Sequence, residues 1–224
     1  MKAMILAAGR GERLRPLTDT TPKPLMQAGP KRLIEYLIHA LVTAGFNDLV
    51  INYAHLGEQF PETLGDGSRY GARIQYSPET AGGLETAGGI INALPLLGEA
   101  PFLVVNGDIW TDFDFNHIRP EMLATEMLCH LVLVDNPPHN PDGDFGLDPD
   151  ARLNMAGDSK WTYSGIGLYR PDMFAGLDNS KRPLKPLFEQ AIADQRVSGQ
   201  LYHGDWSDIG TIERLEALEK QLSS

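Results

Sequence analysis

The chain has 224 residues, of which 42% are hydrophobic and 22% are charged, as in an ordinary soluble globular protein. This length fits a single α/β domain with a substantial core. The formal net charge of -11 argues against a nucleic-acid-binding protein, which usually carries a basic face. The N-terminus does not read as a signal peptide, and no apolar run reaches the roughly 20 residues that cross a bilayer. We therefore expect a soluble, cytoplasmic protein without nucleic-acid or membrane partners.

The first 25 residues join a buried strand (Lys2–Leu6), a turn of alanine and glycine at 7–11, and several basic residues. Small residues let the backbone approach a ligand closely, and exposed N–H groups in such a turn bind anions. If a nucleoside triphosphate lies across the strand end, Arg13, Arg15 and Lys23 would hold its phosphates. The turn lacks the third glycine of GxGxxG, and the chain has no GxxxxGK[ST] P-loop. On the turn alone, an ordinary surface turn is an equal alternative.

Helical and strand periodicities alternate after this segment. Strand, helix, strand, helix, strand predicts right-handed crossovers and a Rossmann-like, mostly parallel sheet flanked by helices. The expected elements are a helix over 31–44, a strand over 47–54, a helix over 56–64, a strand over 72–77 and a helix over 85–97.

Two glycines, Gly88 and Gly89, lie at the start of the helix expected over 85–97. Each costs about 1 kcal/mol in a helix relative to alanine. Close approach by a ligand and tight packing of the helix onto the sheet explain them equally well.

The stretch 101–110 begins with the continuous apolar run Phe102–Val105, which is typical of a central parallel strand. Asn106 and Asp108 follow at its carboxyl end, where open α/β sheets place their ligands. A carboxylate at this position suits Mg²⁺, although aspartates with a purely structural role are also common at strand ends.

The second half predicts a helix around 116–125, strands over 127–135, 161–169 and 199–204, and a helix over 185–195. The only cysteine, Cys129, falls in a strand, so no intrachain disulfide is possible and a buried structural thiol is expected. The run 142–148 does not fit a calcium loop, and residues 163–165 do not form a nucleophile elbow. The six histidines show no metal-ligand spacing.

The string LAAGRGERLRPLT followed by TPKPL resembles the signature of the sugar-1-phosphate nucleotidylyltransferase family, LAAGxGxRLxPLT…PKP. The resemblance continues in VVNGDIW (104–110) and WSDIGT (206–211) and covers essentially the whole chain. It implies a single domain over 1–224, with a nucleotide-binding half at about 1–110 and a sugar-binding half at about 111–224.

The resemblance also implies roles for individual residues. Arg13, Lys23 and Asp108 are the expected catalytic residues, and Asp108 and Asp208 are expected to hold Mg²⁺. The expected sugar ligands are Asn106, Asp144, Ser164, Gly165 and Lys185. The chain lacks the family's E-K-P stretch, whose lysine grips the sugar phosphate; Lys160 and Lys185 are the candidate substitutes. The expected nucleotide-binding residues are Leu6, Ala7, Ala8, Gly9, Gly11, Glu12, Arg13, Lys23, Glu79, Leu84, Glu85 and Gly88.

The activity implied by the resemblance is formation of a nucleotide sugar and pyrophosphate from a triphosphate and a sugar 1-phosphate. The leading expectation is UTP with N-acetylmuramic acid 1-phosphate, in recycling of the bacterial cell wall. The alternatives are another pair, such as GTP with mannose 1-phosphate, and a non-catalytic nucleotide-sugar sensor. The sensor is disfavoured because Arg13, Lys23, Asp108 and Asp208 are all present. The oligomeric state is left open, with a monomer as one option.

Overall fold

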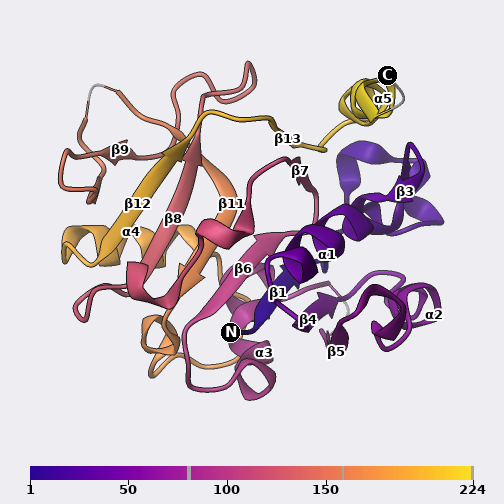
Figure 1. The fold of residues 1–224 in the computed structure, drawn as a ribbon, viewed down its shortest axis with the longest axis horizontal. Helices are drawn as coiled ribbons and strands as arrows, with labels where there is room; N and C mark the ends of the chain where they lie inside the picture. Colours follow the sequence, from indigo (N-terminus) through magenta and orange to yellow (C-terminus); the bar gives the residue numbers. More distant parts are fainter. Residues whose placement is uncertain (80–81, 158, 223–224) are drawn as a thin grey trace.

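The fold is known from a computed structural model, which describes residues 1–79, 82–157 and 159–222. A seven-stranded sheet lies at its centre in the order β12-β8-β11-β6-β1-β4-β5. Only β11 runs antiparallel to its neighbours, and the other adjacent pairs are parallel (Figure 1). The predicted mostly parallel sheet flanked by helices is therefore confirmed. The strands are β1 (Ala3–Leu6), β4 (Asp48–Tyr53), β5 (Arg73–Pro78), β6 (Phe102–Asn106), β8 (Cys129–Val134), β11 (Thr162–Tyr169) and β12 (Val197–Tyr202).

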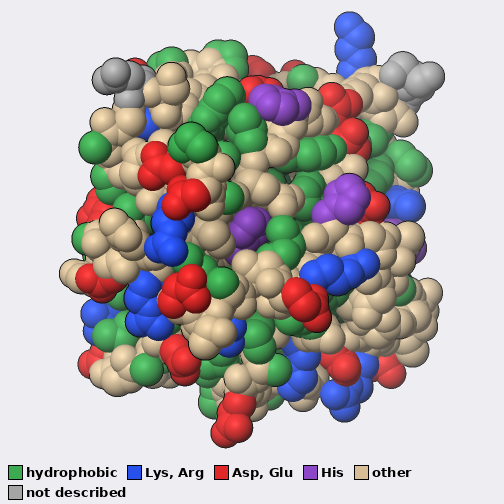
Figure 2. All heavy atoms as spheres, turned by 60° about the vertical axis from the view of Figure 1, so that its left-hand side comes forward, with side chains coloured by type: hydrophobic (Ala, Val, Ile, Leu, Met, Phe, Trp, Pro, Cys, Tyr) green, Lys and Arg blue, Asp and Glu red, His purple; other side chains and the backbone are tan. Residues whose placement is uncertain are grey.

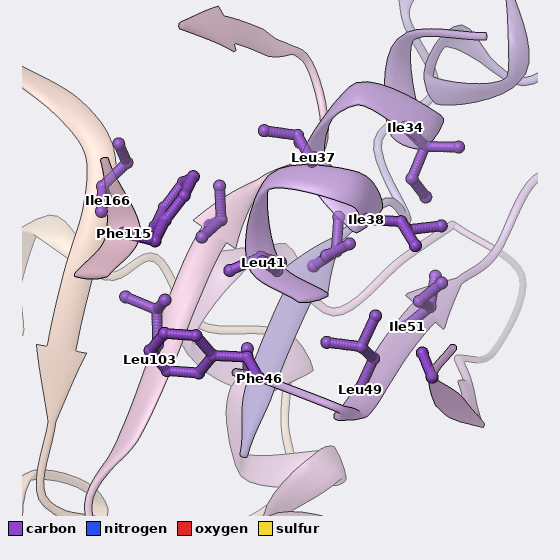
Figure 3. Close-up of a cluster of buried hydrophobic side chains, with 14 of the residues drawn as sticks. Ile34, Leu37, Ile38, Leu41, Phe46, Leu49, Ile51, Leu103, Phe115 and Ile166 are labelled. Carbon is purple, nitrogen blue, oxygen red and sulfur yellow. The ribbon is translucent and has the colours of Figure 1, made fainter. Parts of the chain in front are cut away.

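Helices cover both faces of the sheet. Helix α1 (Leu33–Thr43) packs on one face, whereas α3 (Glu85–Leu97) and α4 (Lys185–Ala193) pack on the other. The short helix α2 (Gln59–Leu64) follows β4. Because successive side chains of a strand point to opposite faces, Leu103 of β6 faces α1 while Val104 faces α3. Figure 3 shows the α1 side, where Ile34, Leu37, Ile38 and Leu41 lie over Leu49, Ile51 and Leu103.

A third cluster ties the last helix to the N-terminal segment. Helix α5 (Ile212–Leu222) buries Leu215 and Leu218 against Leu14, Met26 and Leu33. Two short antiparallel pairs support this contact: β2 (Gln27–Ala28) with β3 (Lys31–Arg32), and β7 (Ile109–Thr111) with β13 (Trp206–Asp208). A third pair, β9 (Gly146–Leu147) with β10 (Leu153–Asn154), lies in the second half of the chain. The last helix is thus held against residues 14–33 of the N-terminal half.

Helix α1 begins two residues later than the sequence predicts. Lys31 and Arg32 pair with Gln27 and Ala28 in a short hairpin, so they cannot also form the first turn of the helix. The carboxylate of Glu35 accepts a 2.8 Å hydrogen bond from the backbone N–H of Arg32, which caps the helix at this point.

The helix predicted around 116–125 is wrong. The chain forms two 3-10 turns there, Phe115–His117 and Pro120–Met122. Proline cannot donate a backbone hydrogen bond and drives the residue before it to an extended conformation, which Arg119 adopts.

The stretch 101–110 belongs to two strands, because β6 ends at Asn106 and the chain then leaves the central sheet to form β7.

The surface mixes charges of both signs. On the face drawn in Figure 2, acidic and basic side chains are interspersed, so the net negative charge does not form one continuous patch there. Cys129 is fully buried and unpaired, and burial raises the pKa of its thiol, as expected for a structural cysteine. Within the described ranges, none of the helices has the length and apolar character needed to cross a membrane.

Both glycines at the start of α3 are explained by packing. A Cβ at Gly88 would overlap the carbonyl oxygen of Ser180, in the loop that precedes α4. A Cβ at Gly89 would overlap Oε1 of Glu79 and lie 2.8 Å from Nδ2 of Asn52. The expected ligand approach at Gly88 therefore corresponds here to the approach of a protein loop. Thr80 and Ala81, which precede α3 in the sequence, lie outside the described residues.

We predict that Gly89→Ala destabilises the protein, although alanine is normally the better helix former. Glu79 cannot move aside freely because both its carboxylate oxygens are hydrogen-bonded, so the added methyl group should cost about 1–3 kcal/mol of unfolding free energy. Chemical denaturation measures this cost. In a Glu79→Ala background, which supplies room for the methyl group, the cost should largely disappear; an equal cost in both backgrounds would contradict the packing explanation.

We also predict a pH-dependent loss of stability from His130 of β8, which is 5% exposed. Burial lowers the pKa of His130 below its ordinary 6.5, opposed in part by a hydrogen bond with Gln200. As the pH falls below about 6.5, the unfolded chain takes up the proton before the folded one, so stability present above that pH is lost. Denaturation of wild type and His130→Gln between about pH 7.5 and 5.5 should show the smaller loss in the variant. Parallel losses would refute the prediction.

Candidate active site

The site is built at the carboxyl ends of three adjacent parallel strands. The strand pairing sets Leu6 of β1 beside Asn52 of β4 on one side and Asn106 of β6 on the other. The turn after β1 is anchored there, because the N–H of Ala7 donates to Oδ1 of Asn52 at 2.8 Å. A cavity of about 310 Å³ opens at this edge. Its lining includes Leu6, Ala7, Ala8, Gly9, Arg10, Lys23, Asn52, Glu79, Glu85, Asn106, Asp108 and Lys181.

Asn52 is a residue of this site that the sequence reasoning missed. It is 2% exposed, and its amide nitrogen donates to Oε1 of Glu79 at 2.6 Å. The other carboxylate oxygen of Glu79 accepts from the N–H of Leu84 at 2.6 Å. Asn52 therefore links the turn after β1 to the start of α3. A signal was available, since an amide at the end of a parallel strand lies where such sheets place their ligands.

Three basic residues of the N-terminal segment, Arg10, Arg13 and Lys23, line two neighbouring hollows. Lys23 is 9% exposed, and its Nζ lies 2.5 Å from Oδ2 of Asp108. Besides the first cavity, Lys23 lines a smaller hollow of about 180 Å³ together with Gly11, Glu12 and Arg13. Gly11 begins a 3-10 turn with a φ of 69°, a backbone conformation that favours glycine. This turn places Arg13 beside Lys23.

Arg15 lies elsewhere. Its Nε is 3.0 Å from Oδ1 of Asp19, and Arg10 contacts the same oxygen at 2.6 Å. The hydrogen bond from Arg10 in particular lowers the pKa of Asp19. Arg15 lines neither of these hollows in the described part of the chain, so its expected hold on phosphate is replaced by an ion pair that fixes the segment.

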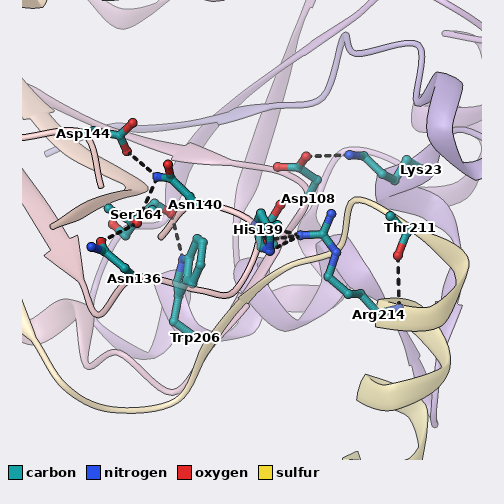
Figure 4. Close-up of polar contacts among 12 residues, drawn as sticks. Lys23, Asp108, Asn136, His139, Asn140, Asp144, Ser164, Trp206, Thr211 and Arg214 are labelled. Atoms are coloured by element: carbon teal, nitrogen blue, oxygen red, sulfur yellow. Dashed lines mark hydrogen bonds and ion pairs between the residues drawn. The ribbon is translucent and has the colours of Figure 1, made fainter. Parts of the chain in front are cut away.

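The pairing of β7 with β13 brings Asp208 back to Asp108. The N–H of Ile209 donates to the carbonyl oxygen of Asp108 at 2.7 Å. The carboxylate of Asp208 bonds Nη1 of Arg214 and lies 2.9 Å from Nε2 of His139. Figure 4 shows His139 and Arg214 meeting next to the pair formed by Lys23 and Asp108.

The residues present fit a magnesium site of the kind expected. Mg²⁺ prefers one or two carboxylates, with waters and substrate phosphates as its other ligands. Asp208 on β13 and Asp108, which directly precedes the paired strand β7, supply two carboxylates, each now neutralised by a basic side chain. Among the described residues, no group of three acidic, histidine or cysteine side chains forms a protein-only cage. The donor set therefore suits an ion whose coordination a phosphate completes.

A second cavity, of about 560 Å³, shares Glu85, Thr86 and Asn106 with the first. Its wall has an apolar part, which includes Phe145, Met155 and Phe188. Its polar part includes Asp144, Lys160, Tyr163 and Lys185. Oδ2 of Asp144 accepts from the N–H of Tyr163 at 2.8 Å, so its position is fixed. Neither Lys160 nor Lys185 forms an ion pair within the described residues.

Four residues predicted to bind the nucleotide or the sugar do not line the three hollows described above. Ser164 is fully buried and its hydroxyl donates to the carbonyl oxygen of Val132 at 2.7 Å, so this proton is already engaged in the free protein and the contact with sugar stays a prediction. A Cβ at Gly165 would overlap the side chain of Asn106, which makes Gly165 a support for that residue. Leu84 contributes backbone bonds, and Gly88 packs on the loop before α4. The sequence also gave no sign of His139 or Arg214.

Comparison with known proteins identifies the family. The sequence model described as Nucleotidyl transferase matches residues 2–224. An N-acetylmuramate alpha-1-phosphate uridylyltransferase of Neisseria meningitidis serogroup B is 56% identical over 221 residues, 96% of each chain. Its counterpart in Caulobacter vibrioides is 32% identical over 99% of this chain and 96% of its own.

A solved structure carries the same fold. A Bacillus anthracis protein crystallised with a sucrose superposes with a TM-score of 0.85 at 20% identity, covering 99% of this chain and 95% of its own. The resemblance read from the N-terminal signature is thus confirmed along the whole sequence. The chain belongs to the nucleotidyl transferase family.

Proposed function

We propose that the protein transfers a uridylyl group from UTP to N-acetylmuramic acid 1-phosphate, forming UDP-N-acetylmuramic acid and pyrophosphate, in the cytoplasm and in the recycling of cell-wall material. The observation that carries the proposal is identity of 56% across 96% of both chains to a uridylyltransferase of that specificity. The two joined cavities support it, since they provide adjacent places for a nucleotide and for a sugar phosphate.

In the reaction, an oxygen of the sugar phosphate attacks the α-phosphorus of UTP. The new P–O bond forms as the bond from the α-phosphorus to the bridging oxygen breaks, and that electron pair leaves with pyrophosphate. The second pKa of a phosphate, about 6, leaves the nucleophile largely ionised at neutral pH, so no general base is needed. Positioning and charge neutralisation remain for the protein to supply.

The side chains near the strand ends fit those tasks. Lys23 lines both the nucleotide cavity and the smaller hollow, where it would stabilise charge that develops near the α-phosphate. Arg13 lies in the smaller hollow, where it would hold the departing pyrophosphate. Asp108 and Asp208 would hold Mg²⁺, which supplies further neutralisation of the phosphates.

The second cavity favours a sugar with more than one negative group. Lys160 and Lys185 both line it without an acidic partner among the described residues, so one lysine can pair with the sugar phosphate while the other remains available for a second anionic group. The lactyl ether of muramic acid adds a carboxylate that the second lysine can pair with, and a methyl group that suits the apolar wall. Mannose 1-phosphate, the alternative substrate with GTP, offers neither group.

We predict that pyrophosphate release with Mg²⁺ is greatest for UTP with N-acetylmuramic acid 1-phosphate, across four triphosphates and several sugar 1-phosphates. N-acetylglucosamine 1-phosphate is the matched control, because it lacks only the lactyl ether; its kcat/KM should be lower by at least about tenfold. Comparable kcat/KM values for the two sugars would remove the case for a muramic-acid enzyme. A signal confined to another pair would show that the protein is a nucleotidylyltransferase with a different substrate. A protein that binds UTP but is silent with every pair would favour the sensor.

We predict that Lys23→Ala lowers kcat by roughly a hundred- to a thousandfold, the usual cost of removing a single preorganised charge stabiliser. Steady-state kinetics measure this, with Lys31→Ala as a control, since Lys31 lies over the ring of Tyr36 in the short β2–β3 hairpin. Near-normal turnover in Lys23→Ala would show that the proposed role is wrong.

A further inference from the structure

The carboxylate proposed as the second metal ligand is occupied by a side chain of the last helix. Asp208 bonds Nη1 of Arg214, and both side chains are shielded, at 23% and 20% exposed. Nη1 of Arg214 also lies 2.9 Å from Nε2 of His139. This guanidinium holds Oδ1 of Asp208, and its positive charge repels a cation that approaches the carboxylate, so metal binding at Asp208 should be tighter when Arg214 moves away.

Gly210 lies between the guanidinium groups of Arg214 and Arg13. A Cβ at Gly210 would overlap Nη2 of Arg214 and lie 2.9 Å from Nη2 of Arg13, so two guanidinium groups meet over this glycine. Gly210 lines the small hollow that Arg13 and Lys23 also line. The side chain of Arg13 forms no hydrogen bond or ion pair with the part of the chain that the structure describes.

This arrangement gathers more positive charge than the protein itself neutralises. Lys23 is paired with Asp108 and Arg214 with Asp208, while Arg13 has no acidic partner in the described ranges. If a divalent cation replaced both basic groups on the two carboxylates, all three basic side chains would need an anion nearby. A pyrophosphate group in the small hollow provides one, and arginine forks match phosphate oxygens.

We propose that Arg214 is a phosphate-binding residue that exchanges partners during the reaction. In the free protein it neutralises Asp208; when Asp208 turns to the metal, the guanidinium of Arg214 joins Arg13 on the β- and γ-phosphates of UTP. Asp208 and Arg214 each have a partner of opposite charge before and after the exchange, which avoids the cost of a shielded, uncompensated charge. The inference rests on the proposed function, since it assumes a triphosphate in the first cavity.

Two binding measurements test the exchange, and they should change in opposite directions. Arg214→Gln keeps an amide that can bond Asp208 but removes the competing charge. Titration of the free protein with Mn²⁺ should therefore show an affinity about three- to fivefold higher than in wild type. Calorimetric titration with UTP at saturating Mg²⁺ should show an affinity at least about tenfold lower, because a charged hydrogen-bond donor to phosphate is lost.

Two further variants complete the test. Lys220→Gln, on the exposed part of the same helix, removes a charge without touching the site and should leave both affinities unchanged. Arg214→Lys keeps the charge but loses the fork, so it should bind Mn²⁺ like wild type and UTP more weakly; it also serves if Arg214→Gln fails to fold. If wild type binds UTP and both Arg214 variants match it in both affinities, the exchange is refuted. If wild type itself does not bind UTP, the proposed function fails instead.

Discussion

The pairing of β7 with β13 is the contact on which the site depends. These strands lie outside the central sheet, and they join a segment near the middle of the chain to one near its end. Their ladder places Asp208 next to Asp108 and directs the following helix, α5, onto the N-terminal segment. Without this pairing, the two carboxylates and the guanidinium of Arg214 would have no common location.

Ion pairs hold the basic side chains near the site in the free protein. A net charge of -11 repels a polyanion at long range, so binding a triphosphate needs a concentrated local source of positive charge. Lys23, Arg214 and Arg10 lie at or near the first cavity, and each is held by a carboxylate: Asp108, Asp208 and Asp19. Such pairs keep shielded cations from standing alone in the free protein, and two of them involve the carboxylates that suit a metal. Substrate and metal binding are therefore expected to be coupled.

Close packing controls the boundary between the two cavities. Asn106 lies at that boundary, supported from below by Gly165, whose φ of 82° and missing side chain allow the contact. In the first cavity, the missing side chain of Gly89 leaves space for the hydrogen bond between Asn52 and Glu79. Glycines near this site thus act by admitting neighbouring protein groups, which then present polar side chains to the cavities.

The amino-acid sequence by itself determined the mostly parallel sheet, the family, and the segments that line the first cavity. These features follow from local patterns: apolar strand runs, helical periodicity and a long contiguous signature around Arg13 and Lys23. It did not reveal that the hydroxyl of Ser164, a predicted sugar ligand, donates to the carbonyl oxygen of Val132, because a motif carries no information on such a distant partner. Only the tertiary structure decided the roles of Asn52, His139 and Arg214, whose partners lie 27, 75 and 6 residues away along the chain. Even the nearest of these contacts depends on how β13 and α5 are docked, and long-range docking leaves no periodic trace in the sequence.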